Sequence, residues 1–202
     1  MYNIIMPEAT VDRISERLGP SNLPEVKIDQ KELYHGSGSG DIAKFNPAEE
    51  TTIGKGLYLT SDINAAAGYA KRRSKGEEGL VPSVYKVEVK NLRMADLRTV
   101  EGVKLFADLL RKRLFTESKK PNLEWYQEAS IQKTLEVIRT NSYKALKDIT
   151  WNHQDLVTQI IKDQGFDGLI AIEGGEGDEV GNHDSYVVFD PSKVEIKSKI
   201  KL

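Results

Sequence analysis

The sequence has no cysteine among its 202 residues and only three histidines. Without cysteine it can form no disulfide, no thiol nucleophile and no thiolate zinc site. The three histidines are His35, His153 and His183, and they are too scattered in the sequence to predict a multi-histidine metal site. We therefore expect no metal cofactor.

Long apolar runs and an excess of charge of one sign are also missing. No stretch approaches the roughly 20 apolar residues that cross a bilayer, and the N-terminal residues lack the basic start of a secretory signal. The 29 basic and 31 acidic residues nearly cancel, at a net charge of −2, so no overall attraction to nucleic acid or anionic membrane is expected. We predict a cytoplasmic protein that does not bind a membrane.

The pattern of apolar residues divides the chain into strands, then helices, then strands. Strands are predicted at 33–35, 56–60, 83–89, 168–172, 185–190 and 194–200, and helical spacing dominates 101–164. Regular alternation of strand and helix is absent, so the fold class is predicted as α+β. A further helix, capped by Ser61 or Asp62, is expected to run through Tyr69 to about residue 73.

Two segments are expected around this core. Residues 1–30 form an N-terminal helix, with Val11, Ile14 and Leu18 on one face, and a linker. Residues 31–202 form one domain, and 101–164 is a helical insertion with Phe106, Leu110, Leu114, Ile160 and Ile161 turned inward.

Three short segments stand out in this order. The first is Tyr34-His35-Gly36-Ser37. The second is GKGLYLT at 54–60, followed by a helix whose Tyr69 comes eleven residues after Tyr58. The third is DSYVVFDP at 184–191. Each segment alone is typical of an ordinary turn or a packed strand.

Together the three segments resemble the motifs of the ADP-ribosyltransferase fold, in its diphtheria-toxin and poly(ADP-ribose) polymerase branch. The third segment is most similar to that of bacterial and phage transferase domains. The resemblance implies a split antiparallel sheet, NAD as substrate and a mono-ADP-ribosyltransferase that modifies a protein or nucleic acid. It also implies a toxin or a phage effector, with an antitoxin or another protein as a partner.

The resemblance also implies roles for single residues. His35 would bind the adenosine ribose, the Gly36 backbone would hold the nicotinamide carboxamide, and Ser37 would add a hydroxyl contact. Tyr58 and Tyr69 would stack on the two faces of the nicotinamide ring. Glycine at position 36 is expected to leave room for the ligand, and phenylalanine is expected to replace either tyrosine without loss. Where the family often has a carboxamide-binding serine, this sequence has Ala66.

The acid of the third motif is missing. Ser185 stands where the family has the glutamate that holds the ribose 2′-hydroxyl and stabilises the cationic transition state. We expect Asp184 to supply the charge through a local irregularity of the strand, which makes His35, Tyr58, Asp184 and Ser185 the catalytic candidates. Two alternatives stay open: a glutamate of the preceding loop (Glu173, Glu176 or Glu179), or a site that binds NAD and turns it over poorly.

Other functions stay open as well. A degenerate module that binds NAD or ADP-ribose, or an NAD glycohydrolase, fits the same motifs. RNA 2′-phosphotransfer ranks last, because no arginine lies within the three motifs. The insertion is expected to recognise the acceptor or a partner. The basic runs at 71–75 and 111–113 are expected to be solvated helix faces.

Overall fold

The structure is a computed structural model, and it describes residues 23–46, 53–75, 79–140, 150, 152–174 and 180–202. The expected helix around 11–18 lies outside the described residues. In chain order the elements are β1 (Glu25–Ser37), β2 (Leu57–Thr60), α2 (Ile63–Ser74), β3 (Ser83–Asp96), α3 (Val100–Glu117), α4 (Trp125–Thr140), α6 (Gln154–Asp163), β4 (Gly168–Glu173), β5 (His183–Val188), a 3-10 turn (Pro191–Lys193) and β6 (Val194–Lys201).

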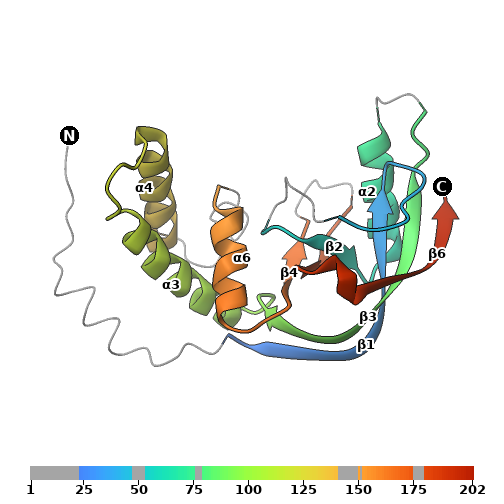
Figure 1. The fold of residues 1–202 in the computed structure, drawn as a ribbon, viewed down its shortest axis with the longest axis horizontal. Coiled ribbons are helices and arrows are strands. Elements are labelled where there is room, and N and C mark those ends of the chain that lie inside the picture. Colours follow the sequence, from blue (N-terminus) through green and yellow to red (C-terminus); the bar gives the residue numbers. More distant parts are fainter. Residues whose placement is uncertain (1–22, 47–52, 76–78, 141–149, 151, 175–179) are drawn as a thin grey trace.

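The six strands form one sheet in the order β1-β2-β5-β4-β3-β6, and β1 pairs with β3 as well. This extra pairing brings the two halves of the sheet round toward each other, as the long curved β1 and β3 in Figure 1 show. The halves are joined by the single pair Tyr34↔Thr60 between β1 and β2 and by the short β3–β4 pairing. The pairing is antiparallel, as expected, except between β3 and β4, which are parallel.

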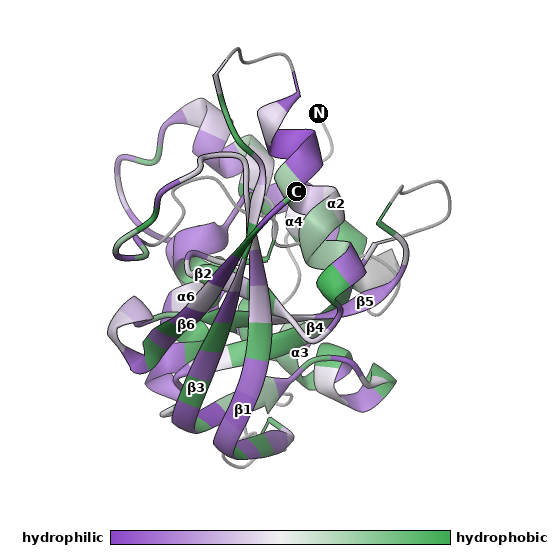
Figure 2. Ribbon diagram, turned by 90° about the vertical axis from the view of Figure 1, so that its right-hand side faces the viewer, coloured by the Kyte–Doolittle hydropathy of each residue, from purple (hydrophilic) through white to green (hydrophobic). Residues whose placement is uncertain are grey.

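The first strand is much longer than the sequence pattern predicts. β1 begins at Glu25, so residues 25–30, expected to be linker, already pair with β3. Bands of opposite hydropathy alternate along β1, β3 and β6 in Figure 2, as expected of strands with one face toward a core. The charged residues of 25–32 hid this strand from a search for apolar runs.

The expected helical insertion is confirmed. Helices α3, α4 and α6 stand together on one side of the sheet (Figure 1), and they share one apolar cluster with residues of β4 and β5. All five residues predicted to face inward are buried in it: Phe106, Leu110, Leu114, Ile160 and Ile161. A second cluster fills the space between β1, β3 and the other face of β4 and β5.

Helix α2 follows β2 directly and covers the end of β1. Asp62 is its N-cap, because the carboxylate accepts a hydrogen bond from the Asn64 N–H at 2.8 Å. The buried side of α2 is made of small residues (Ala65, Ala66 and Ala70), which let the helix approach the strand closely. Among the described helices, none has the length and apolar content needed to span a bilayer.

The shared cluster predicts that the insertion and the sheet unfold together. Leu110 on α3 is fully buried, so Leu110→Ala should lower the free energy of unfolding by about 2–5 kcal/mol. Val100→Ala on the same helix is the matched control, because Val100 is 68% exposed and surface changes typically cost less than about 0.5 kcal/mol. Urea unfolding followed by far-UV and near-UV circular dichroism measures both. Separate transitions for helices and sheet would contradict this account.

Candidate active site

His35 lies near the end of β1 and ties this strand to β2. Its Nδ1 lies 2.9 Å from the carbonyl oxygen of Tyr58. A carbonyl only accepts hydrogen bonds, so Nδ1 carries the proton and Nε2 of the neutral ring is left as an acceptor. The ring packs edge-on against Phe45, with centroids 5.0 Å apart. His35 is therefore held in one orientation and one tautomer.

Burial lowers the pKa of His35, and the nearby charge of Arg73 lowers it further, while the hydrogen bond to the Tyr58 carbonyl opposes both. The neutral ring is thus the form that the fold favours. A neutral imidazole can accept a hydrogen bond from a hydroxyl, which an imidazolium cannot do.

Gly36 is required by the packing of α2 against β1. A Cβ at this position would lie 1.9 Å from the carbonyl oxygen of Ala66. The sequence predicts room for a ligand beside this glycine, whereas in the structure the backbone of α2 occupies the space that a side chain here would take. Next to it, Ser37 is buried and its hydroxyl accepts a hydrogen bond from the Ser39 N–H at 3.2 Å.

Tyr58 is anchored through its hydroxyl. The oxygen accepts a hydrogen bond from the Ile53 N–H at 2.8 Å and donates one to the Gly54 carbonyl at 3.0 Å. The expected tolerance of phenylalanine concerns NAD binding; for folding, Tyr58→Phe would leave the Ile53 N–H unpaired, at a cost of about 1–3 kcal/mol. The ring packs on the edge of the cluster shared with the insertion.

Tyr69 projects from α2 toward β5. Its ring meets that of His183 edge-on, with centroids 5.5 Å apart, and the Arg72 guanidinium lies 4.7 Å from its centroid. His183 is buried, and its Nδ1 donates to the Gly181 carbonyl at 3.0 Å. The second tyrosine of the motif therefore comes to lie beside the third motif.

Strand β5 runs between β2 and β4 and carries the third motif. Ser185 pairs with Thr60 of β2 on one side and with Ala171 of β4 on the other. Its hydroxyl donates a hydrogen bond of 2.6 Å to Oε2 of Glu173, the last residue of β4, and both residues are buried. A carboxylate thus lies within one hydrogen bond of the position where the resemblance expects one.

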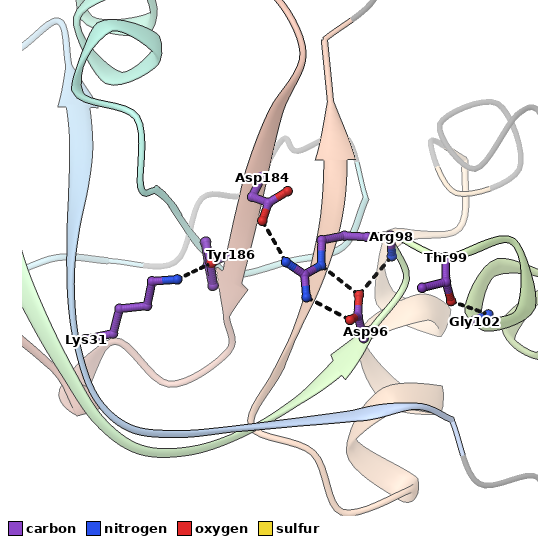
Figure 3. A network of polar contacts seen from close by, with 7 residues as sticks. All are labelled: Lys31, Asp96, Arg98, Thr99, Gly102, Asp184 and Tyr186. Atoms are coloured by element: carbon purple, nitrogen blue, oxygen red, sulfur yellow. Dashed lines mark hydrogen bonds and ion pairs between the residues drawn. The ribbon is translucent and has the colours of Figure 1, made fainter.

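Asp184 lies on the other face of β5, as the alternation of a regular strand requires. Its carboxylate binds Arg98 at 2.7 Å, and Asp96 holds the same guanidinium through two bonds of 2.8 Å (Figure 3). Tyr186, two residues further on, meets Lys31 on this face. The side chains of Asp184 and Ser185 therefore lie on opposite faces of β5.

This network has a defined charge state. The Arg98 hydrogen bonds lower the pKa of Asp96, and Asp96 with Asp184 raises the pKa of Arg98. The position of Asp184 is therefore explained by a structural ion pair at the end of β3. No group of three or more potential metal ligands occurs among the described residues.

A comparison with family models agrees with the motifs. A family model described as "ADP-Ribosyltransferase in polyvalent proteins" matches residues 29–200. One chain in the crystal structure of the M. tuberculosis MbcT-MbcA toxin-antitoxin complex is similar, at 11% identity and a TM-score of 0.46, over 97% of this chain and 93% of that one. No curated protein matches.

The protein thus has an α+β fold of the ADP-ribosyltransferase type. More narrowly, the chain belongs to the family of ADP-ribosyltransferases in polyvalent proteins.

The structure brings most of the expected site residues into one region. His35 and Tyr58 are joined by a hydrogen bond, Gly36 touches the helix that carries Tyr69, and Tyr69 touches β5. His183 is an addition that the sequence motifs did not single out. Of the three alternative acids, Glu173 reaches Ser185, whereas Glu176 and Glu179 lie outside the described residues.

The close contact at Gly36 predicts that adding one methyl group there strongly lowers the free energy of unfolding. Gly36→Ala should lower the free energy of unfolding by about 3 kcal/mol or more, because β1 and α2 must separate. Gly40→Ala is the matched control: its Cβ would meet nothing closer than 3.5 Å, so a loss within about 1 kcal/mol is expected. Equal unfolding midpoints in urea for the two variants would contradict the packing role.

The lowered pKa of His35 predicts a dependence of stability on pH. The unfolded chain, with an ordinary pKa of 6.5, takes up a proton that the folded ring resists. The stability that His35 contributes to the fold is therefore fully present above pH 6.5. It is lost as the pH falls through that value toward the pKa of His35 in the folded protein. His35→Gln should show a smaller drop in unfolding free energy than the wild type between about pH 7.5 and about pH 5.5.

NMR of the imidazole protons supplies the independent check for this residue. The burial of His153 lowers its pKa too, so the two rings must be assigned separately. A His35 ring that titrates at or above the value of a free histidine would contradict the prediction.

Proposed function

We propose that this protein transfers ADP-ribose from NAD to a macromolecular acceptor, with release of nicotinamide. Membership of the ADP-ribosyltransferase family supports the reaction class. The observation that carries the proposal is the meeting of β1, β2 and α2, where His35 bonds to the Tyr58 backbone and Gly36 packs on the helix that bears Tyr69. These are four of the five residues to which the resemblance gives NAD-binding roles, the fifth being Ser37.

The local chemistry suits the substrate. His35 offers Nε2 as an acceptor for a ribose hydroxyl, and its low pKa keeps that nitrogen unprotonated at neutral pH. Tyr58 and Tyr69 supply aromatic rings for the nicotinamide. Ala66 offers no hydroxyl, so the carboxamide must be held by the backbone at Gly36 and by Ser37. The small buried side of α2 is what brings its tyrosine close to β5.

The reaction exchanges one bond at C1′ of the nicotinamide ribose. The bond from C1′ to the nicotinamide nitrogen breaks, and its electron pair stays on the pyridine ring, which leaves as neutral nicotinamide. The ribose becomes oxocarbenium-like, and a lone pair of the acceptor forms the new bond to C1′ while the acceptor loses a proton. The protein must stabilise the positive charge on the ribose in the transition state.

The biological setting is part of the proposal. We infer a cytoplasmic effector, either a bacterial toxin with a protein antitoxin or a phage protein that modifies its host. The insertion helices α3, α4 and α6 lie beside the sheet and are the part of the chain that the NAD motifs do not use, so we assign acceptor or partner recognition to them.

The test is incubation of the protein with adenine-labelled NAD and a bacterial lysate. Label fixed to protein or nucleic acid supports the transferase. Free labelled ADP-ribose would instead indicate a glycohydrolase, and NAD that is bound but intact would indicate a degenerate binding module.

A matched pair of variants tests the pocket. Tyr69→Ala should weaken NAD binding several-fold, because a stacked ring contributes on the order of 1 kcal/mol. Tyr126→Ala should leave it unchanged, because Tyr126 is 56% exposed on α4, away from the NAD motifs. Isothermal titration with NAD gives both affinities, and thermal unfolding reports any loss of folding. Unchanged affinity in Tyr69→Ala together with a lower melting temperature would assign Tyr69 to packing.

A further inference from the structure

The third motif lacks its acid, yet a carboxylate occupies the space beside it. Ser185 lies on the face of β5 that also carries His183. In the neighbouring strand β2, Thr60 pairs with Ser185 and Tyr58 pairs with Val187. Glu173 enters the same face from β4, where it pairs with His183. The serine hydroxyl and the carboxylate are 2.6 Å apart.

Glu173 is an unusual residue for a purely structural role. It is 8% exposed, and no lysine or arginine of the described residues pairs with it. Its one side-chain hydrogen bond among those residues comes from Ser185, and none of them donates to Oε1. Oε1 is not among the buried side-chain atoms that lack a partner, so it is accessible from outside the described structure. A ligand that donates a hydrogen bond can therefore reach it.

Within the described part of the chain, the neighbouring histidine also has an atom that lacks a hydrogen-bond partner. His183 is 7% exposed, and its Nε2 is buried with no hydrogen-bond partner among the described residues. Because Nδ1 donates to the Gly181 carbonyl, Nε2 is an acceptor in the neutral ring. The buried Nε2 of His183 and the accessible Oε1 of Glu173 thus belong to residues that pair between β5 and β4, and Tyr69 packs on His183. A ligand that presents hydroxyl groups can donate to both.

We propose that Glu173, and not an acid of the third motif, is the catalytic carboxylate of this protein, held in place by Ser185. The proposal rests on the proposed function and names the residue that completes its site. The acid has moved from β5 to the neighbouring strand, and the serine left behind has become its positioning residue.

An acid at position 173 with a serine at position 185 can perform the required chemistry. The Ser185 hydroxyl donates a hydrogen bond to Oε2, which fixes the carboxylate and leaves Oε1 to accept a hydrogen bond from the ribose 2′-hydroxyl. The negative charge then lies beside the ribose as C1′ becomes cationic. A serine side chain plus one hydrogen bond spans about the reach of a glutamate at position 185, so the carboxylate ends in a similar place. Asp184 has no such access, because it is bound to Arg98 on the other face.

The experiment compares three variants by nicotinamide release from NAD. Glu173→Gln keeps the size of the side chain and removes the charge, so kcat should fall about a hundredfold while the NAD dissociation constant changes little. Asp184→Asn, the same chemical change on the opposite face, should keep kcat within about twofold and lower the melting temperature. The double variant Glu173→Ser with Ser185→Glu, which returns the acid to β5, should recover at least a tenth of the wild-type rate.

The outcomes separate the two proposals. If the wild-type protein releases no nicotinamide, alone or with the lysate, the proposed function fails and this inference falls with it. If the wild type is active and Glu173→Gln keeps its rate, only the assignment of Glu173 is overturned. A loss of rate in Asp184→Asn that matches that of Glu173→Gln would overturn it too. Circular dichroism of each variant separates unfolding from loss of chemistry, and the double variant gives the answer should Glu173→Gln fail to fold.

Discussion

The two-residue alternation of β5 is the constraint on which the site depends. This strand is hydrogen-bonded on both edges, to β2 and to β4, so it can neither rotate nor slip without breaking two ladders. Its register sends Ser185 and His183 to the face shared with Tyr58 and Glu173. It places Asp184 and Tyr186 on the opposite face, where they bind Arg98 and Lys31. Which acid can serve the proposed chemistry follows from this division.

The second constraint is the close approach of α2 to β1. A cap at Asp62, a row of alanines and a glycine at position 36 let the helix backbone touch the strand backbone. This contact carries Tyr69 to His183 and leaves no volume for a larger residue. Ala66 lies on the buried side of α2, where a small side chain suits the close approach of the helix. Packing therefore constrains the same few positions to which our proposal assigns substrate binding.

Local patterns in the sequence predicted the parts of the fold that depend on local physics. Alternating apolar residues marked β3, helical spacing marked the insertion, and an aspartate before an alanine run marked α2. What the sequence could not predict depends on contacts between distant strands. The charged residues of β1 became a strand because β3 pairs with them, and the contact of Glu173 with Ser185 follows from the β4–β5 register, which no local pattern in the sequence predicts. The anchoring of the Tyr58 hydroxyl by a preceding loop is of the same kind.

A crystal structure with a non-cleavable NAD analogue tests the central claim most directly. The account predicts the analogue between Tyr58 and Tyr69, with a hydroxyl of the nicotinamide ribose within about 3.2 Å of the Glu173 carboxylate and Asp184 still bound to Arg98. An analogue whose ribose lies out of reach of Glu173, with Asp184 released from Arg98 to bind it, would contradict the account.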